Sequence, residues 1–250
     1  MNEISQSSLH CYLSAEHPCG YLPDRLARSQ VALPGQIVNT EVYGKLLQLG
    51  FRRSGLHVYR PHCDACCACV PVRVAVDGFR PNRAQRRAKQ RNAGMQVTQL
   101  KAYFDPEHFE LYQRYQSARH AGGGMDHDDR ERYTDFLVSS AVETRMLVFR
   151  QEGVLRMVSL VDRVADGLSA VYTFFDPDLA ASSLGVFNVL WQIDWARQLS
   201  LPYLYLGYWV ENSQKMAYKQ QYQPLERRIN GLWQAEIITG QGENCDSILN

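Results

Sequence analysis

The 250-residue sequence contains no long hydrophobic run. No segment approaches the ~18 consecutive apolar residues of a membrane-spanning helix, and residues 1–20 lack the basic segment followed by an apolar segment that marks a secretory signal. Apolar residues make up 45% of the chain and charged residues 21%, which excludes disordered and collagen-like proteins. We therefore expect a globular, cytoplasmic protein of one or two domains with no membrane partner.

The formal net charge of +1 conceals an uneven distribution of charge. Residues 1–91 carry 13 Lys and Arg against 6 Asp and Glu, whereas residues 92–250 carry 14 against 20. This asymmetry predicts an anionic partner for the first part of the chain. The alternative is that two oppositely charged domains attract each other.

The chain also lacks the cysteine spacing of an ordinary zinc ribbon. Four of its seven cysteines lie between residues 63 and 69, but Cys11 and Cys19 are separated by seven residues and form no second pair at a spacing of three. In a long cytoplasmic chain, disulfides are not expected. Reduced structural thiols and a zinc or iron-sulfur site remain the two interpretations. The ligands of such a site would be Cys19, Cys63 and Cys66 with Cys67 or Cys69.

Residues 80–91 contain six basic residues and no acid. Pro81 followed by good helix formers predicts a helix with a row of cations along one face. Such a row matches a phosphate backbone, so we predict a nucleic acid, RNA or DNA, as its partner, with a strong dependence of affinity on salt. A solvated helix face is the alternative. The candidate residues are Arg80, Arg83, Arg86, Arg87, Lys89 and Arg91.

The composition and the spacing of apolar residues change near residues 92–103. This change predicts a Cys-rich and basic N-terminal α/β domain over residues 1–97 and a second domain over residues 98–250. In the first domain a strand is expected at 70–76. In the second domain the patterns predict helices at 105–122 and from 126, strands at 146–149, 155–164 and 168–175, a long buried helix at 184–195 and a strand at 203–208. Antiparallel strands, a helix and a further strand is the order of the GCN5-related acyltransferase fold, and the fold class is α+β.

Residues 203–226 are unusually aromatic, with five tyrosines, one tryptophan and two lysines around a strand end and a helix start. Aromatic walls with a few cations suit a peptide or nucleotide end. The alternative is the edge of an aromatic core with lysines on the surface.

Four motifs in order resemble one protein family. They are CGYLP at 19–23, CDACCACVPVRV at 63–74, VYTFFDPDLAASSLG at 171–185 and YLYLGYWVENSQKMAYK at 203–219. Together they resemble the arginyl-tRNA-protein transferases, and more closely their bacterial branch, the aspartate/glutamate leucyltransferases. The similarity runs from about Cys11 to Glu226.

This resemblance implies transfer of leucine from Leu-tRNA to a protein whose N-terminal residue is Asp or Glu, which marks that protein for degradation. An α-amine has a reference pKa of about 7.7 to 8.0 and the aminoacyl ester is already activated, so no covalent enzyme nucleophile is required. The expected catalytic residues are Asp176, Tyr208 and Glu211. The expected substrate-binding residues are Arg73, Tyr172, Lys215, Tyr218 and Lys219, of which the three cations are candidates for pairing with the acceptor carboxylate.

Two departures from the family pattern affect the site. Leu22 stands where eukaryotic members have a second cysteine, so a fourth cluster ligand would have to be Cys63, Cys69 or His62. The strand YLYLGY contains no acid, which leaves the general base unassigned.

Two other functions compete with aminoacyl transfer. An acetyl-CoA-dependent acetyltransferase would share the fold order, but its phosphate loop needs several glycines, and DLAASSLG has only Gly185. A metal-dependent nucleic-acid-binding module would not need the 150 residues that follow the basic segment.

Overall fold

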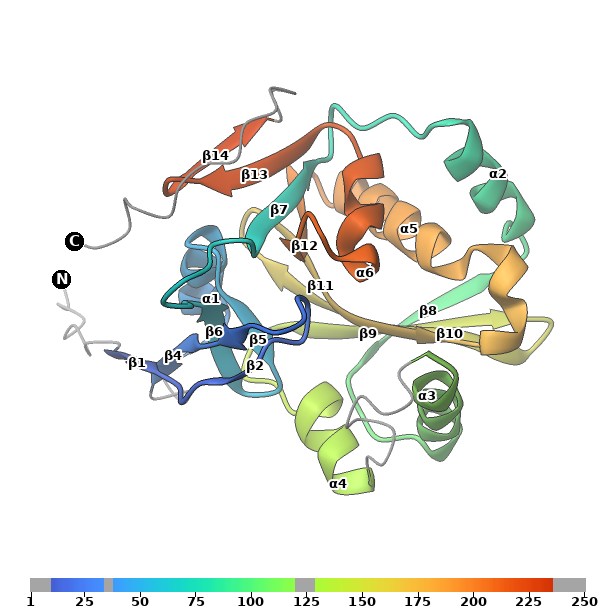
Figure 1. Cartoon of the computed structure of the whole chain (residues 1–250). Coiled ribbons are helices and arrows are strands. Elements are labelled where there is room, and N and C mark those ends of the chain that lie inside the picture. Colours follow the sequence, from blue (N-terminus) through green and yellow to red (C-terminus); the bar gives the residue numbers. More distant parts are fainter. Residues whose placement is uncertain (1–9, 34–37, 120–128, 236–250) are drawn as a thin grey trace, which may run out of the picture.

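The structure is a computed structural model that describes residues 10–33, 38–119 and 129–235. Its centre is an eight-stranded sheet of order β14-β13-β7-β12-β11-β10-β9-β8 (Figure 1). The strands are β7 (Val70–Ala75), β8 (Gln96–Lys101), β9 (Thr144–Gln151), β10 (Val154–Val164), β11 (Gly167–Phe175), β12 (Tyr203–Trp209), β13 (Leu225–Ile229) and β14 (Leu232–Ala235). Only β11 and β12 pair in parallel, as a helical crossover requires.

A four-stranded sheet of order β1-β4-β6-β5 lies beside the large one. Its strands are β1 (His10–Leu13), β4 (Ser29–Leu33), β6 (His57–Pro61) and β5 (Arg52–Ser54), and β2 (His17–Pro18) pairs with β3 (Leu26–Ala27). Helix α1 (Thr40–Gln48) begins at Asn39, whose side chain accepts the Val42 N–H. The helix packs on Val164 of β10, so the small sheet is attached to the large one through this helix.

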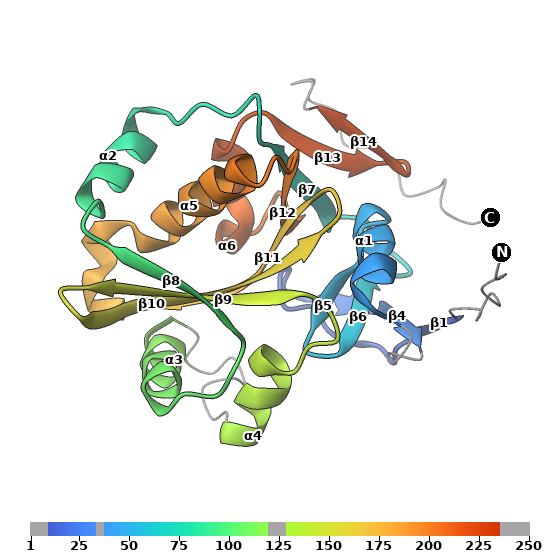
Figure 2. The same ribbon diagram turned by 180° about the vertical axis from the view of Figure 1, so that it is seen from behind.

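Helices cover the two faces of the large sheet (Figures 1 and 2). One face carries α5 (Leu184–Gln198) and α2 (Arg83–Arg91), and the other carries α3 (Pro106–Arg119) and α4 (Arg130–Tyr133) with the π turn Thr134–Val138. The side chains of β9 alternate between the two cores, with Leu147 facing α5 and Met146 facing α3. After β12 come α6 (Gln214–Ala217) and the 3-10 turn Tyr218–Gln221, and Pro177–Ser182 forms a 3-10 segment before α5.

The expected elements of the second domain are confirmed in type and order, including the three antiparallel strands, the long helix and the strand after it. The helix from 126 and the Gly122–Gly124 stop fall partly outside the described residues. The helix expected over 80–91 begins only at Arg83, because Asn82 and Gln85 form a reciprocal cap, so Arg80 precedes the helix rather than lying on its face.

The mixed helix and strand architecture is confirmed, with parts from both ends of the chain in one sheet. β7 comes from the first 97 residues and lies between β12 and β13. The division at residues 97 and 98 stays a prediction. No helix among the described residues is long and apolar enough to cross a membrane.

Candidate functional site

The sheet opens between β11 and β12. The two strands pair only from Gly167 to Ser169 on β11 and from Tyr203 to Tyr205 on β12. Just past this point each strand shows a register shift against its other neighbour, after Leu160 of β10 and after Tyr205 of β12. Bulges of this kind bend strands and are common next to active sites. The opening between β11 and β12 is therefore the candidate substrate-binding site.

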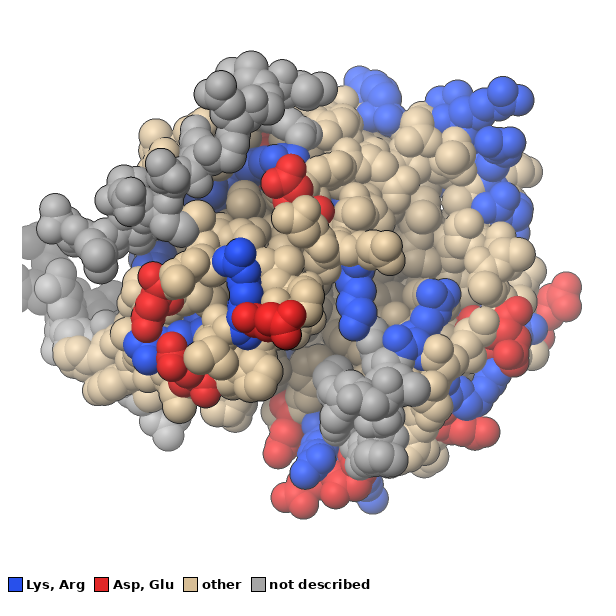
Figure 3. Space-filling view, in the orientation of Figure 1, with Lys and Arg blue, Asp and Glu red and all other residues tan. Residues whose placement is uncertain are grey.

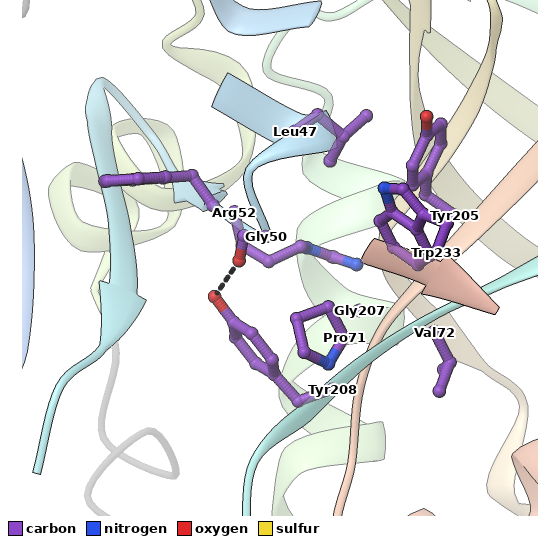
Figure 4. Close-up of a pocket in the computed structure, with 10 residues that line it drawn as sticks. Leu47, Gly50, Arg52, Pro71, Val72, Tyr205, Gly207, Tyr208 and Trp233 are labelled. Atoms are coloured by element: carbon purple, nitrogen blue, oxygen red, sulfur yellow. Dashed lines mark hydrogen bonds between the residues drawn. The ribbon is translucent and has the colours of Figure 1, made fainter. Parts of the chain in front are cut away.

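Arg52 of β5 reaches into this opening from the small sheet. Its guanidinium donates a 2.6 Å hydrogen bond to the Ala170 carbonyl of β11. On the other side lies Gly207 of β12, where an added Cβ would stand only 2.4 Å from Nη1 of Arg52. Gly207 also has a φ of +80°, a backbone conformation that favours glycine. Glycine is therefore required at this position both by the backbone conformation and by the close approach of the guanidinium (Figure 4).

Lys219 is the second cation of the opening. It is only 5% exposed, and its ammonium donates to the Tyr208 carbonyl of β12 and to Sδ of Met216 at 3.2 Å. Burial, and secondarily the charge of Arg52, lowers the pKa of Lys219 from 10.5 to about 7. Within the described residues neither Arg52 nor Lys219 has a carboxylate within ion-pair distance.

Tyrosines surround the two cations. The Tyr208 hydroxyl donates to the Gly50 carbonyl at 2.8 Å, as Figure 4 shows, and burial raises the pKa of Tyr208 well above its usual value. Tyr218 is 45% exposed, and burial of its hydroxyl end together with the nearby Tyr115 raises its pKa although Arg52 lowers it. The structure thus brings together three of the expected site residues, Tyr208, Tyr218 and Lys219.

No sequence pattern identified Arg52 as a candidate site residue. It stands in the segment FRRSG, outside all four family motifs and outside the basic row, and its neighbours in the site lie 118 or more residues further along the chain. No local pattern marks it.

Asp176 and Tyr172 lie toward the other end of β11. Six residues of strand from Ala170 to Asp176 span about 20 Å. The Asp176 carboxylate accepts hydrogen bonds from Arg114 at 2.9 Å and Arg156 at 2.8 Å, so its charge is already compensated. The Tyr172 hydroxyl accepts a 3.1 Å hydrogen bond from Gln116 of α3. The catalytic role expected for Asp176 and the binding role expected for Tyr172 remain predictions.

The other expected residues are dispersed. The Arg73 guanidinium lies between the rings of Tyr203 and Trp233, 3.4 Å and 4.4 Å from their centroids, and pairs with Glu226 at 2.7 Å. Its charge is thus satisfied inside the sheet. The side chains expected to bind or act on substrate beyond β12, Glu211 and Lys215, are exposed to solvent.

The cysteines lie next to the opening. Burial, and to a smaller extent the thiols of Cys63, Cys19 and Cys66, raises the pKa of Cys69 to about 12, so Cys69 lies within electrostatic range of these three thiols. In the described part of the chain, however, no three Cys, His, Asp or Glu side chains meet as metal ligands, and the Cys63 thiol donates to the Arg28 carbonyl at 3.7 Å. The described geometry does not assemble a metal site, so no chemical step is assigned to one. Cys67 is disulfide-bonded in the structure, contrary to the expectation of no disulfides, whereas Cys19, Cys63, Cys66 and Cys69 are free thiols. The ligand set Cys19, Cys63 and Cys66 with Cys67 or Cys69 remains a prediction, and of the last two only Cys69 is free.

The basic row on α2 is only partly available to a ligand. Lys89 pairs with Asp194, Arg91 donates to the Ser183 hydroxyl, and Arg86 donates to the Pro81 carbonyl. Arg83 and Arg87 are exposed. Figure 3 shows Lys and Arg gathered over the position of α2, and it shows the molecule hollowed below α6 with further cations at the rim.

Two family models match the chain. The model described as arginine-tRNA-protein transferase, N terminus, matches residues 17–87, and the model described as arginine-tRNA-protein transferase, C terminus, matches residues 107–229. The chain belongs to the arginine-tRNA-protein transferase family. The resemblance carried by the four motifs is thereby confirmed, and the family models cover both the cysteine segment and the opening between β11 and β12.

Relatives within this family are similar over nearly their whole length. A protein of Thiobacillus denitrificans is 56% identical over 90% of this chain and 93% of its own length. Proteins of Chromobacterium violaceum and Nitrosospira multiformis are 55% and 53% identical over 91% and 94% of this chain, covering 94% and 93% of their own lengths. All three are named aspartate/glutamate leucyltransferase.

Two solved structures are more distantly similar. The crystal structure of FemX matches 86% of this chain and 85% of its own chain with a TM-score of 0.49 and 8% sequence identity. The structure of L-PGS from Bacillus licheniformis matches 67% of this chain and 58% of its own with a TM-score of 0.48 and 12% identity.

Proposed function

We propose that this protein is an aspartate/glutamate leucyltransferase of the cytoplasm, which moves leucine from Leu-tRNA to the N-terminal Asp or Glu of an acceptor protein and so marks it for degradation. The observation that carries the proposal is the identity of 53–56% to relatives of that name over at least nine tenths of the chain. The opening between β11 and β12 supports it, because a site built from cations and tyrosines suits an anionic acceptor and an aminoacyl-adenosine end.

The reaction needs few groups from the protein. The neutral α-amine of the acceptor attacks the carbonyl carbon of the leucyl ester, forming the new C–N bond. The C–O bond to the tRNA ribose then breaks, and the amine proton passes to the departing oxygen or to solvent. The ester is already activated, so holding amine and carbonyl together supplies most of the acceleration.

Tyr208 is suited to orientation rather than to proton removal. Its hydroxyl proton is donated to the Gly50 carbonyl, and its raised pKa keeps the phenol protonated. We assign it the role of holding the segment between α1 and β5, at Gly50, against β12 beside the opening. Tyr218 is the exposed ring of the site and is suited to stack on the terminal base of the tRNA.

We propose α2 as a contact for the tRNA backbone. Arg83 and Arg87 are four residues apart on one helix face and are exposed, whereas Lys89 and Arg91 are held by Asp194 and Ser183. The finer fold assignment, a GCN5-related acyltransferase-like domain, is proposed on the strand order and on the short parallel pairing of β11 with β12.

A zinc or iron-sulfur site at the cysteines is proposed separately from the reaction. The free thiols of Cys19, Cys63, Cys66 and Cys69 supply suitable soft donors. Metal and sulfide analysis of protein purified with and without oxygen tests it: one cluster or zinc ion per chain supports the site, and metal-free active protein contradicts it.

Leucine transfer is tested with radiolabelled Leu-tRNA and Arg-tRNA against peptides that begin with Asp, Glu or Ala. Label from leucine on the Asp and Glu peptides alone supports the proposed function. Transfer from neither tRNA contradicts it, and a shift of melting temperature with acetyl-CoA would then favour an acetyltransferase.

A further inference from the structure

Two cations without a described counter-charge stand in the opening between β11 and β12, the half-buried Arg52 and the buried Lys219. Arg52 and Lys219 lack a carboxylate partner among residues 10–33, 38–119 and 129–235, and Nη1 of Arg52 is buried without any hydrogen-bond partner there. Burying an unpaired cation is costly, and proteins that retain one generally use it at a functional site. The charges of Arg52 and Lys219 also repel each other. An anion between them would relieve both penalties.

The two cations lie against two neighbouring residues of β12. Nη1 of Arg52 lies against Gly207, and Nζ of Lys219 bonds to the carbonyl of the next residue, Tyr208. Arg52 is also bonded to β11 through Ala170. A guanidinium has five N–H donors and an ammonium has three, so each cation keeps donors for a further acceptor.

The size of the space favours a small terminal group. The cavity beside the Arg52 guanidinium, which Figure 4 shows, has a volume of about 10 Å³ and is lined by Gly207, Tyr208 and Trp233 among others, whereas Lys219 is not one of its lining residues. This volume admits about one oxygen-sized group. A backbone phosphate carries a sugar on either side, and both sugars would have to enter with it. A side-chain carboxylate ends a chain, so one of its two oxygens can enter beside Arg52 without further groups.

We propose that Arg52 and Lys219 together bind the side-chain carboxylate of the acceptor's N-terminal Asp or Glu. This assignment rests on the proposed leucine transfer and adds the residue that selects the acceptor. The carboxylate is separated from the α-amine by only a few bonds, so anchoring it holds the amine beside the opening. Asn and Gln acceptors lack the negative charge and leave both cations unpaired, which is the basis for rejecting them.

Arg52→Gln is the central test. Glutamine keeps an N–H donor for the Ala170 carbonyl but removes the charge. We expect kcat/KM for an Asp peptide to fall at least about 10-fold, the size expected for losing a charged hydrogen bond, while kcat/KM for the matching Asn peptide changes by less than about threefold. Arg52→Lys should recover part of the preference. Arg163→Gln on β10, exposed and outside the opening, is the matched control.

The outcomes separate the two levels of the proposal. If wild-type protein transfers no leucine to any peptide, the proposed function is wrong. If wild-type protein transfers leucine but Arg52→Gln prefers Asp over Asn as strongly as before, only the carboxylate site is wrong. If the variant instead raises the KM for Leu-tRNA and slows transfer to all peptides equally, the cations bind the tRNA and the inference fails.

A measurement on wild-type protein covers the case in which the variant does not fold. Lys219 is expected to react with an amine-acylating reagent at pH 8, read out by mass spectrometry, and an Asp dipeptide should protect it while the Asn dipeptide should not. Equal protection by both dipeptides, or by neither, would overturn the carboxylate site.

Discussion

Arg52 and Arg53 are consecutive residues of β5 with opposite surroundings. Arg53 points to the large sheet, where it forms a buried bidentate pair with Asp162 at 2.6 Å and 2.7 Å and also bonds Thr144. Arg52 points into the opening, where it meets one carbonyl and no described carboxylate. Side chains alternate along a strand, so one step in sequence separates the two roles. A compensated buried charge holds the two sheets together, and an uncompensated one indicates a ligand.

The largest expected effect is at the compensated pair. Asp162→Ala leaves Arg53 buried without a counter-charge, and we expect a loss of about 3–5 kcal/mol in the free energy of unfolding, measured with urea. The exposed pair Glu41–Lys45 on α1 is the control. Glu41→Ala should leave the free energy of unfolding nearly unchanged, because solvent screens this exposed pair. A loss at Asp162 no larger than at Glu41 would show that the pair does not join the sheets.

Gly207→Ala tests how tightly Arg52 is held, and Gly153→Ala is its control because both glycines have a φ of +80°. The left-handed backbone costs about 1–2 kcal/mol at either position. An added Cβ meets nothing within 4 Å at Gly153 but meets Arg52 at Gly207. We expect Gly207→Ala to cost about 1–2 kcal/mol more than the control, and also to weaken discrimination of Asp from Asn peptides. Equal costs would mean that Arg52 moves away freely.

Lys219→Met tests the cost of the uncompensated cation through its pH dependence. The pKa of Lys219 is about 7 in the folded protein, against 10.5 for an ordinary lysine. Below pH 7 both folded and unfolded chains carry the charge and the burial cost is full. Between pH 7 and 10.5 the folded chain releases the proton, so wild-type stability rises relative to the variant by about 1.4 kcal/mol per pH unit.

Lys219→Met is therefore expected to raise the melting temperature more at pH 6 than at pH 9, while it weakens transfer to Asp peptides. Lys215→Met on the exposed surface of α6 is the control and should show no such pH dependence. An equal stability gain at both pH values would mean that Lys219 does not lose its proton in this range.

The smallest effect is expected at α2. Replacing Arg83 and Arg87 with Gln should weaken Leu-tRNA binding and reduce the slope of log affinity against log salt by about 1 for each lost phosphate contact. Discrimination of Asp from Asn peptides should be unchanged, in contrast to Arg52→Gln. Filter binding at several salt concentrations measures the slope, and an unchanged slope would remove α2 from the tRNA interface.

Much of the local structure could be predicted from residue patterns. The β9–β11 strands follow from apolar alternation between turns such as Glu152-Gly153, and the basic helix follows from its helix formers. The pattern places the start of that helix two or more residues too early. The helix begins at Arg83 because the side chains of Asn82 and Gln85 cap it reciprocally, and such a cap does not appear in the spacing of the basic residues. Tyr208, Tyr218 and Lys219 of the last motif are expected from the sequence, and the structure places them around the opening, while their roles stay predictions.

The pairing of charges could not be predicted. Arg73 and Lys219 both stand in family motifs and both are cations. Arg73 is neutralised by Glu226, 153 residues further along, whereas among the described residues Lys219 bonds to a carbonyl and a sulfur and to no carboxylate. Whether a cation is available to a substrate depends on the acids that the fold brings to it. Asp176 is the reverse case, an acid in a motif that two arginines compensate.

By itself the sequence determined the family, the order of helices and strands, and the presence of a cationic, aromatic segment after the long helix, because these depend on residues that are neighbours in the chain. The tertiary structure decided that β7 enters the middle of the large sheet, that β11 and β12 part after three paired residues, and that Arg52 enters the gap between them. The paired residues of β11 and β12 are 36 positions apart, and those of β7 with β12 and of Arg52 with Ala170 are more than a hundred apart, so only the folded chain brings them within hydrogen-bonding distance.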